Sequence, residues 1–299
     1  MGHHGARRTI LVTGAAGPAG RALGVQLGRR TESVRAVGVD LVPTPVPGMD
    51  EVHAAPPARS AEYEARTVAL LRSLEPSLVI PTVSDELPRM AVLARAAGLG
   101  YRVVISAPGP TAVADDKLLT MWALDHAGVT VPRHAPADEL GTAADALRWA
   151  GGPVVLKPRV SRGGRGVHVV TDPADAAWQH ADASWIVQEL APGDEYSPQV
   201  YRSPATGTCD VVVLRKTALE HGIVGNAADV ERLPAGAAAD VEELAVRTVE
   251  VLGLVGPVDM DVRRLADGTP VVLEVNARFG ALSASAPELL DAVLESWPR

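Results

Sequence analysis

The chain has 299 residues, 47% of them hydrophobic, and a formal net charge of −8 at pH 7. This composition excludes a mainly disordered protein, and the acidic balance argues against a nucleic-acid-binding surface. No window approaches the roughly 18 uncharged apolar residues of a membrane span, so a bilayer is not an expected partner. The first residues lead straight into a strand-like run and not into a signal-peptide core. We therefore expect a cytoplasmic protein.

The N-terminal third predicts a parallel sheet with helices on both faces. Residues 9–13 form a strand-like run, residues 14–20 a glycine turn, and a helix to about Arg29 leads to a second strand at 34–40. The turn can bring a helix N-terminus to a phosphate, with Asp40 placed for a ribose, or it can simply let the helix pack closely on the sheet. The alternation continues through a helix within 60–74, a strand at 77–81, a helix from Ser84 to Gly98 and a strand at 101–106.

The loop at residues 81–86 follows a predicted strand, at the edge where open α/β sheets place ligand crevices. Alternatively, Ser84 in this loop serves only as a helix N-cap. The Pro-Gly-Pro sequence at 108–110 then indicates a linker. A helix follows from residues 115–117, and its predicted apolar face consists of Leu118, Met121 and Trp122.

A cationic, glycine-rich loop joins two predicted strands in the middle of the chain. Lys157 belongs to the first strand, and the loop contains Ser161, Gly163, Gly164 and Gly166 with arginines among them. Backbone N–H groups beside positive charge suit phosphates. The loop is not a Walker A loop, because no Gly-Lys-Ser/Thr follows the glycines. A merely flexible hairpin is the alternative.

Lysine is rare in this chain, whose other basic residues are arginines. The only lysines are Lys117, Lys157 and Lys216, and a retained lysine indicates a need for a compact, movable charge. Lys216 lies in strand-rich sequence near Arg215 and Glu220. These three residues can orient a substrate carboxylate or amine, or they can simply pair on a strand face.

A predicted hairpin near the C-terminus carries the candidate metal ligands. Asp267-Gly268 separates two apolar runs, which predicts a turn between two strands. Asp261 and Glu274 then lie on neighbouring strands facing one side, with the Asn276 amide close by. Oxygen ligands on rigid strands suit Mg²⁺, which usually bridges to substrate phosphates. The alternative is a salt-bridged hairpin on a sheet surface.

Four segments in this order resemble the ATP-grasp superfamily, most closely its carbamoyl-phosphate-synthetase-like carboxylate–amine ligases. They are Asp116-Lys117 at a helix start, Val155-Leu156-Lys157-Pro158 with its glycine loop, Val187-Gln188-Glu189-Leu190 with Glu195, and Asp261 with Glu274-Val275-Asn276-Ala277-Arg278. The resemblance implies an α/β protein with the nucleotide held between two ATP-grasp lobes. Its implied domains are a Rossmann-like domain at 1–110, an N-terminal lobe with the glycine lid at 111–190, and a C-terminal lobe with the metal site at 191–299.

The resemblance also implies a role for each candidate residue. Those that would contact the ATP phosphates, or cover them as a lid, are Lys117, Lys157, Ser161, Gly163, Gly164 and Gly166. Those that would hold the adenine and ribose are Gln188, Glu189, Leu190, Glu195 and Leu273. The ligands of Mg²⁺, with Mn²⁺ as an alternative ion, would be Asp261, Glu274 and Asn276. Arg278 would face the γ-phosphate and, together with Lys157, would serve catalysis through an acyl phosphate.

The implied function is an ATP- and Mg²⁺-dependent ligase. It would activate a small carboxylate, such as an amino acid or peptide-like acid, and join it to an amine with release of ADP and phosphate. The resemblance also favours packing over ligand binding for residues 14–20, and a homodimer. One alternative is an NAD(P)-dependent short-chain dehydrogenase or epimerase, which needs a Tyr-x-x-x-Lys pair that no tyrosine here provides. The other is a non-catalytic nucleotide-binding protein.

Overall fold

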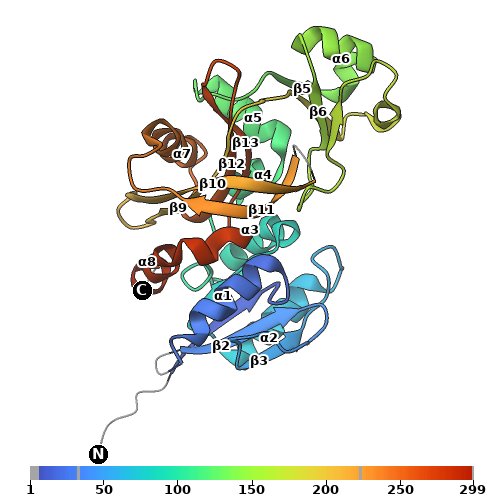
Figure 1. The fold of residues 1–299 in the computed structure, drawn as a ribbon. Helices are drawn as coiled ribbons and strands as arrows, with labels where there is room; N and C mark the ends of the chain where they lie inside the picture. Colours follow the sequence, from blue (N-terminus) through green and yellow to red (C-terminus); the bar gives the residue numbers. More distant parts are fainter. Residues whose placement is uncertain (1–6, 32–33, 222–223, 298–299) are drawn as a thin grey trace, which may run out of the picture.

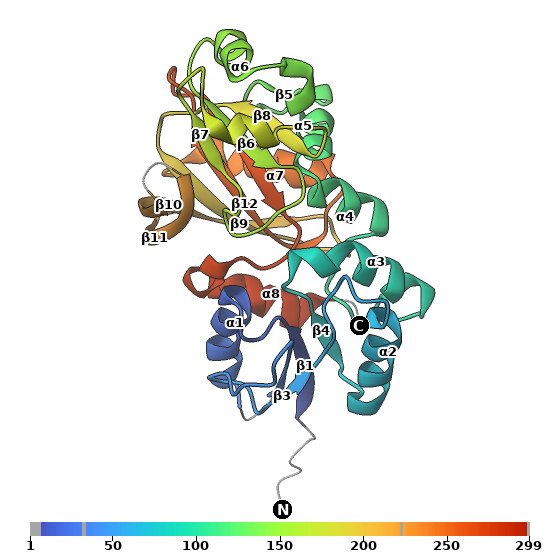
Figure 2. The ribbon, with the colours of Figure 1, turned by 90° about the vertical axis from the view of Figure 1, so that its right-hand side faces the viewer.

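A computed structural model describes residues 7–31, 34–221 and 224–297 of the chain. The named strands form three sheets, of which the N-terminal one is parallel and the other two are antiparallel. In Figure 1 the N-terminal sheet lies below the antiparallel sheets, and Figure 2 shows helix α8 (Pro287–Ser296) between the two parts. The mixed α/β class predicted from the sequence is confirmed.

The N-terminal sheet has the strand order β3-β2-β1-β4. Its strands are β1 (Arg8–Thr13), β2 (Val34–Asp40), β3 (Glu51–Ala54) and β4 (Leu78–Ile80). Alternate residues of β1 face opposite sides: Ile10 and Val12 pack towards α1 (Pro18–Gly28) and α8, whereas Leu11 packs towards α2 (Tyr63–Leu74) and α3 (Leu87–Ala96). Because both faces are covered, the strands read as continuous apolar runs.

A five-stranded sheet with the order β11-β10-β9-β12-β13 forms the centre of the C-terminal part. Its strands are β9 (Glu195–Arg202), β10 (Cys209–His221), β11 (Val224–Arg232), β12 (Gly256–Arg264) and β13 (Pro270–Asn276). One face packs against α4 (Pro108–Asp115), α5 (Lys117–His126) and α7 (Ala239–Val251). The other face packs through Tyr201 and Leu214 against α8, which in turn contacts the N-terminal sheet. One helix therefore fixes the position of the two parts.

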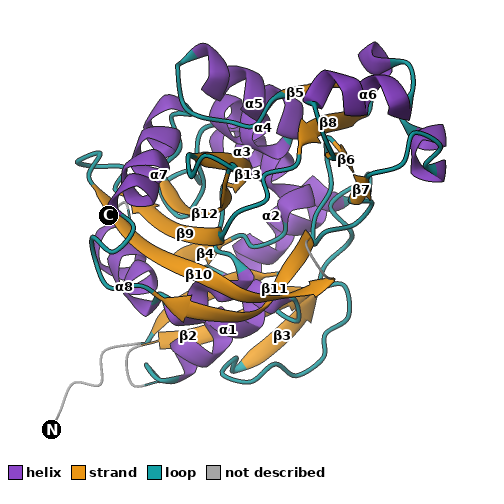
Figure 3. Cartoon of the chain, turned by 45° about the horizontal axis from the view of Figure 1, so that its top comes forward, coloured by secondary structure: helices purple, strands orange, loops and turns teal. Residues whose placement is uncertain are grey.

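A smaller sheet with the order β5-β8-β6-β7 forms the second wall of the C-terminal part. Its strands are β5 (His134–Pro136), β6 (Val154–Pro158), β7 (His168–Val170) and β8 (Trp185–Glu189). Helix α6 (Ala143–Ala150) packs on it, as Figure 3 shows beside β6 and β8. Short 3₁₀ helices complete the fold: η1 (Ser84–Glu86), η2 (Ala137–Leu140), η3 (Ala176–His180) and η4 (Ala281–Ser285).

Two predicted boundaries in the N-terminal third are wrong. The expected strand at 101–106 forms only one isolated bridge, between Val79 and Val103, before the chain leaves the sheet. Residues 108–110 are not a linker but the first turn of α4, where the proline at the first position loses no helical hydrogen bond. The short edge strand β3 is not among the predicted elements, since its residues are partly exposed and give no apolar run.

Two side-chain predictions also differ from the structure. Trp122 was expected on the apolar face of its helix, but it is 48% exposed, whereas Leu118 and Met121 are buried as predicted. Ser84 does not cap a helix, because neither η1 nor α3 receives a side-chain cap. In the described part of the chain, no helix combines the length and the apolar character that crossing a membrane requires.

Candidate active site

A cavity of about 1090 Å³ opens between the small sheet, the large sheet and the carboxyl edge of the N-terminal sheet. The predicted residues that line it are Lys157, Gly163, Gly164, Gln188, Glu189, Leu190, Glu195, Asp261, Leu273, Glu274, Asn276 and Arg278. Lys117 and Ser161 line a small adjoining pocket together with Glu274 and Asn276. The fold thus gathers residues from distant segments of the chain into one place of a size typical for ligand binding.

The predicted hairpin exists and places the two candidate metal carboxylates opposite each other. Asp261 of β12 pairs with Glu274 of β13 in the antiparallel register, and Asp259 pairs with Asn276 two residues away. Directly opposed residues share one face of a sheet, so the oxygens of Asp261, Glu274 and Asn276 can converge. Two carboxylates and an amide oxygen suit a hard divalent cation that completes its shell with phosphate oxygens and water.

The described residues contain no group of three or more His, Cys, Asp or Glu side chains placed to hold a metal ion. The candidate set therefore depends on an amide as its third ligand. One oxygen of each side chain faces a cationic group: Glu274 lies 3.3 Å from Lys117, Asp261 accepts from Lys216 at 2.7 Å, and Asn276 accepts from Arg278 at 2.9 Å. The chemistry of the donor set fits Mg²⁺, and a bound cation would compete with these three contacts.

Lys157 and Lys117 are both buried at the junction of the sheets and the glycine loop. The Lys157 ammonium group donates to the Leu273 carbonyl at 3.0 Å, and burial lowers its pKa to about 8 despite the nearby Glu274 carboxylate. Lys117 follows Asp116, the N-cap of α5, and its ammonium group donates to the Ser161 carbonyl at 3.1 Å. Two concentrated positive charges therefore lie under the loop.

Lys216 of β10 lines the cavity and pairs there with carboxylates of two other strands of its sheet. Its side chain is only 5% exposed and donates to Asp261 at 2.7 Å and to Glu195 at 2.5 Å. Burial opposes its charge, but the two carboxylates outweigh burial and raise its pKa. Arg215, one residue earlier, instead pairs with Glu231 at the exposed surface at 2.5 Å. Both cations thus pair with carboxylates of other strands, Lys216 inside the cavity and Arg215 at the surface, and a substrate contact of Lys216 stays a prediction.

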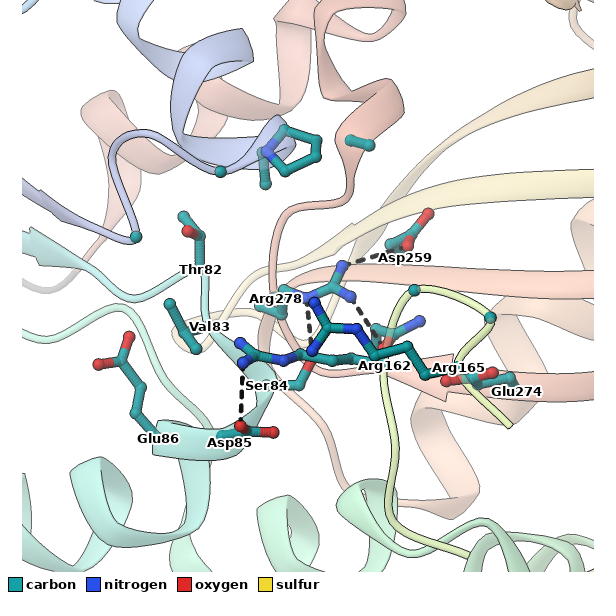
Figure 4. Close-up of a pocket in the computed structure, with 18 of the residues that line it drawn as sticks. Thr82, Val83, Ser84, Asp85, Glu86, Arg162, Arg165, Asp259, Glu274 and Arg278 are labelled. Carbon is teal, nitrogen blue, oxygen red and sulfur yellow. Dashed lines mark hydrogen bonds and ion pairs between the residues drawn. The ribbon is translucent and has the colours of Figure 1, made fainter. Parts of the chain in front are cut away.

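Arg278 sits at the centre of a polar network that sequence reasoning found only in part. Its guanidinium donates to Asp259 at 3.2 Å, to Asn276 and to the Ser84 hydroxyl at 3.3 Å (Figure 4). Asp259 was not predicted, although it is two residues before Asp261 and so on the same strand face. Burial raises the pKa of Asp259, and the Arg278 charge opposes that rise. The ion pair fixes the guanidinium beside the candidate metal site.

The glycine loop reaches the N-terminal sheet through an ion pair. Arg162 of the loop lies 3.2 Å from Asp85 of η1, as Figure 4 shows. Gly163 and Gly164 have φ values of +60° and +68°, which other residues rarely adopt. A Cβ on Gly166 would come within 2.9 Å of Pro158, so this glycine serves close packing and does not line the cavity.

Beyond Arg278 the cavity includes a buried carboxyl group that was not singled out in the sequence. Glu86 accepts hydrogen bonds from the hydroxyl groups of Thr13 and Tyr63, the latter at 3.0 Å. Burial raises the pKa of Glu86. The only sequence signal was its position after a strand of the parallel sheet, at the edge where ligand crevices form.

Comparison with known proteins identifies the family to which this chain belongs. The family described as "ATP-grasp domain" matches residues 114–282, more than half of the chain. The chain therefore belongs to the ATP-grasp domain family, which confirms the resemblance seen in the sequence. The matched segment contains the glycine loop, the hairpin and Arg278.

Relatives with known names are similar over shorter stretches. A formate-dependent phosphoribosylglycinamide formyltransferase of Haloquadratum walsbyi is 32% identical over 115 residues, which is 36% of this chain and 27% of that protein. A D-alanine–D-alanine ligase of Stutzerimonas stutzeri is 31% identical over 177 residues, 56% of each chain. The chain thus spans about a quarter to about half of the length of these curated relatives.

Solved structures share the fold over nearly the whole chain. N5-carboxyaminoimidazole synthetase from Staphylococcus aureus, solved in complex with ADP, superposes with a TM-score of 0.74 at 14% identity. The similarity covers 97% of this chain and 77% of that one. At this identity the comparison establishes a common fold, including the N-terminal sheet.

Proposed function

We propose that this protein is an ATP- and Mg²⁺-dependent ligase that joins a small carboxylate to an amine, with release of ADP and phosphate. The observation that carries the proposal is the convergence of Lys117, Lys157 and Arg278 on the carboxylates of one hairpin, in the cavity and the small pocket that adjoins it. Phosphoryl transfer mainly requires positioning and charge neutralisation. These side chains supply both.

The nucleotide would lie between the small and the large sheet. Its phosphates would meet Lys117 and Lys157 under the loop with Ser161, Gly163 and Gly164. The adenine would lie at the hinge after β8, against Leu273, with the ribose near Glu195.

The N–H groups of Glu189 and Leu190 already donate to the carbonyl groups of Arg133 and Pro153. We therefore place the adenine contact on Ala191, which is the next residue in the chain and lines the cavity. Gln188 is buried beside it, and its amide nitrogen has no partner among the described residues.

The chemistry divides into two balanced steps. A carboxylate oxygen of the substrate attacks the γ-phosphorus, the bond to the β,γ-bridging oxygen breaks, and ADP leaves. The amine nitrogen then attacks the acyl carbon, the carbon–oxygen bond to phosphate breaks, and the nitrogen loses a proton. Mg²⁺ held by Asp261, Glu274 and Asn276, or Mn²⁺ in its place, would neutralise charge on the phosphates.

The chain's own residues would protect the reactive acyl phosphate. Arg278, held by Asp259 at 3.2 Å, would face its phosphoryl oxygens. The glycine loop would cover the site and exclude water until the amine attacks. We propose functional regions at 1–110, 111–190 and 191–299, with the nucleotide between the last two.

ADP release tests this function. We would measure it with Mg²⁺ and a panel of amino acids offered both as carboxylate and as amine, in the wild-type protein, in Lys157→Met and in Glu274→Gln. We expect turnover in the wild type and a loss of at least about 100-fold in each variant. Glu243→Gln, on the exposed face of α7, serves as the control.

If either site variant keeps wild-type turnover, the site assignment is wrong. Tight ATP binding without ADP release on any carboxylate and amine would instead favour the non-catalytic alternative. Binding of NADH without binding of ATP would favour the dehydrogenase alternative.

A further inference from the structure

The cavity extends past Arg278 to a wall formed by two loops of the N-terminal sheet. One loop follows β2 and the other joins β3 to α2, and the residues that line the cavity there are Asp40, Leu41, Ala55, Pro56, Pro57, Ala58 and Arg59. Leu41 is 60% exposed and is the largest aliphatic side chain of this wall. Apart from Asp40 and Arg59, this wall consists of apolar residues that line the cavity.

Asp40 belongs to this wall, but its carboxylate is already engaged. One oxygen accepts from the Ala16 N–H at 2.8 Å, and the other accepts from the Leu41 N–H at 2.7 Å. The first bond ties the end of β2 to the glycine turn, and the second is local to residues 40 and 41. Asp40 therefore stabilises the two loops and does not present its oxygens to a sugar hydroxyl.

The N–H groups of residues 15–17 in the glycine turn likewise form no phosphate cradle. The Ala15 N–H donates to the Val39 carbonyl at 3.1 Å, the Ala16 N–H to Asp40, and the Gly17 N–H to the Gly14 carbonyl at 2.9 Å. Phosphates bind such turns through N–H groups that point at the ligand. Here three successive N–H groups are satisfied internally, Pro18 has none, and the Asp40 carboxylate would repel an anion.

Gly14 has a packing reason to be glycine. Its φ is +59°, and a Cβ there would lie 2.5 Å from a methyl carbon of Val83. The turn therefore needs glycine to pack against the loop after β4. This agrees with the structural alternative stated for residues 14–20.

The opposite end of the same space is polar. Arg278 and the Arg162–Asp85 ion pair lie at this end, and Figure 4 shows them near Asp259 of the hairpin. A guanidinium suits a carboxylate. The charged groups of a small substrate would lie at this end, and its remainder would extend towards Leu41.

We propose that the substrate site at the N-terminal sheet takes an unphosphorylated amino acid with an apolar side chain, which packs against Leu41 and residues 56–58. This proposal rests on the ligase function proposed above and specifies the class of its substrate. It separates this chain from relatives whose names contain a phosphoribosyl group, although they are similar in sequence.

Two neighbouring residues provide a matched test. Leu41 lines the cavity at 60% exposure, whereas Val42 is 62% exposed and is not among the lining residues. We would compare Leu41→Lys with Val42→Lys, using ADP release with leucine, phenylalanine, valine, aspartate, lysine and phosphoribosylglycinamide as probes, the last supplied together with formate as the carboxylate. The KM for ATP and the melting temperature would be measured for each variant.

We expect ADP release with the apolar amino acids and little with the charged or phosphorylated probes. Leu41→Lys should raise the KM for the apolar amino acids by about tenfold or more, because a charge replaces an apolar contact. Val42→Lys should stay within about twofold, and the KM for ATP should be unchanged in both variants.

The proposal is overturned if phosphoribosylglycinamide or a charged amino acid is the preferred probe. It is also overturned if no apolar amino acid elicits ADP release, or if the two lysine variants behave alike. The ligase function survives these results if any other carboxylate and amine support ADP release that Lys157→Met abolishes. The two proposals therefore fail separately.

Discussion

The ammonium group of Lys117 lies 3.3 Å from the carboxylate of Glu274, and the Lys117 side chain is only 5% exposed. A side chain proposed to hold a phosphate is thus paired with one proposed to hold a cation. Lys216 is paired with Asp261 in the same way, at 2.7 Å. A nucleotide carrying a divalent cation can replace both partners of the Lys117–Glu274 pair at once, since its phosphates meet Lys117 while its cation meets Glu274.

Removing the Lys117 charge should therefore increase the affinity for the cation and decrease the affinity for the nucleotide. In Lys117→Met the Glu274 carboxylate loses its cationic neighbour, so we expect Mn²⁺ without nucleotide to bind about fivefold more tightly, as measured by calorimetry. ATP affinity should fall, because a phosphate contact is lost. Arg148→Met, in an exposed pair with Asp145, is the control. Unchanged or weaker Mn²⁺ binding in Lys117→Met would contradict the proposed role of Glu274.

ATP affinity should also depend on pH through Lys157. Burial lowers the pKa of this lysine from its usual 10.5 to about 8. The ammonium group is charged below that pH and neutral above it, so we expect Mg²⁺-free ATP to bind more weakly as pH rises from about 7 to about 9. Titration of ATP at several pH values would measure this effect. Lys157→Arg should bind ATP with a flatter pH dependence, because arginine stays charged.

The lowered pKa of Lys157 affects the stability of the fold in the opposite direction: stability increases with pH while ATP affinity decreases. Between pH 8 and 10.5 the unfolded chain keeps its proton on Lys157 while the folded chain has lost it. The unfolded state then binds more protons, so this lysine makes the free energy of unfolding increase with pH in that window. A fall in ATP affinity that merely followed a fall in stability would contradict the assignment.

Asp259 should act on the reaction through Arg278. A Cβ at position 280 would lie 2.4 Å from the Asp259 carboxyl carbon, so Gly280→Ala should displace this carboxylate without removing any charge. We expect kcat to fall by about tenfold or more, because Arg278 loses its fixed position, with little change in the KM for ATP. Asp259→Asn should do the same.

Gly109→Ala is the matched control, because a Cβ there meets nothing within 4 Å. A KM effect as large as the kcat effect in Gly280→Ala would indicate a general disturbance of the site. Recovery of activity in the double variant Gly280→Ala/Asp259→Asn would contradict the prediction in another way, because it would show that Asp259 is dispensable.

The sequence predicts local features of the site well, because they depend on short-range patterns. The Asp267-Gly268 turn, with φ of +88° at the glycine, sets the register that opposes Asp261 to Glu274. The helix start at Asp116 follows from a side chain that caps its own helix. Such features need only a few neighbouring residues.

Contacts between distant segments were not predictable in this way. The Arg162–Asp85 pair joins residues of different sheets, and the pairing of Lys216 with Glu195 and Asp261 requires three strands in register. The exposure of Trp122 also depends on which helix face meets the sheet. Tertiary packing decides these contacts and this exposure, and the apolar pattern along a single helix or strand does not predict it.

The Arg162–Asp85 pair should hold the glycine loop over the cavity. The atoms are 3.2 Å apart and the side chains are 40% and 22% exposed, so we expect a coupling energy of about 0.5–1 kcal/mol in a double-mutant cycle. Arg162→Gln and Asp85→Asn should each increase ATP hydrolysis without ligation several-fold, because water reaches the acyl phosphate more often when the loop opens. The double variant should leak no more than either single variant.

The ratio of phosphate released to ligated product measures this leakage, and Asp145→Asn, remote from the cavity, is the control. Additive effects of the two substitutions would show that the pair does not act as a latch.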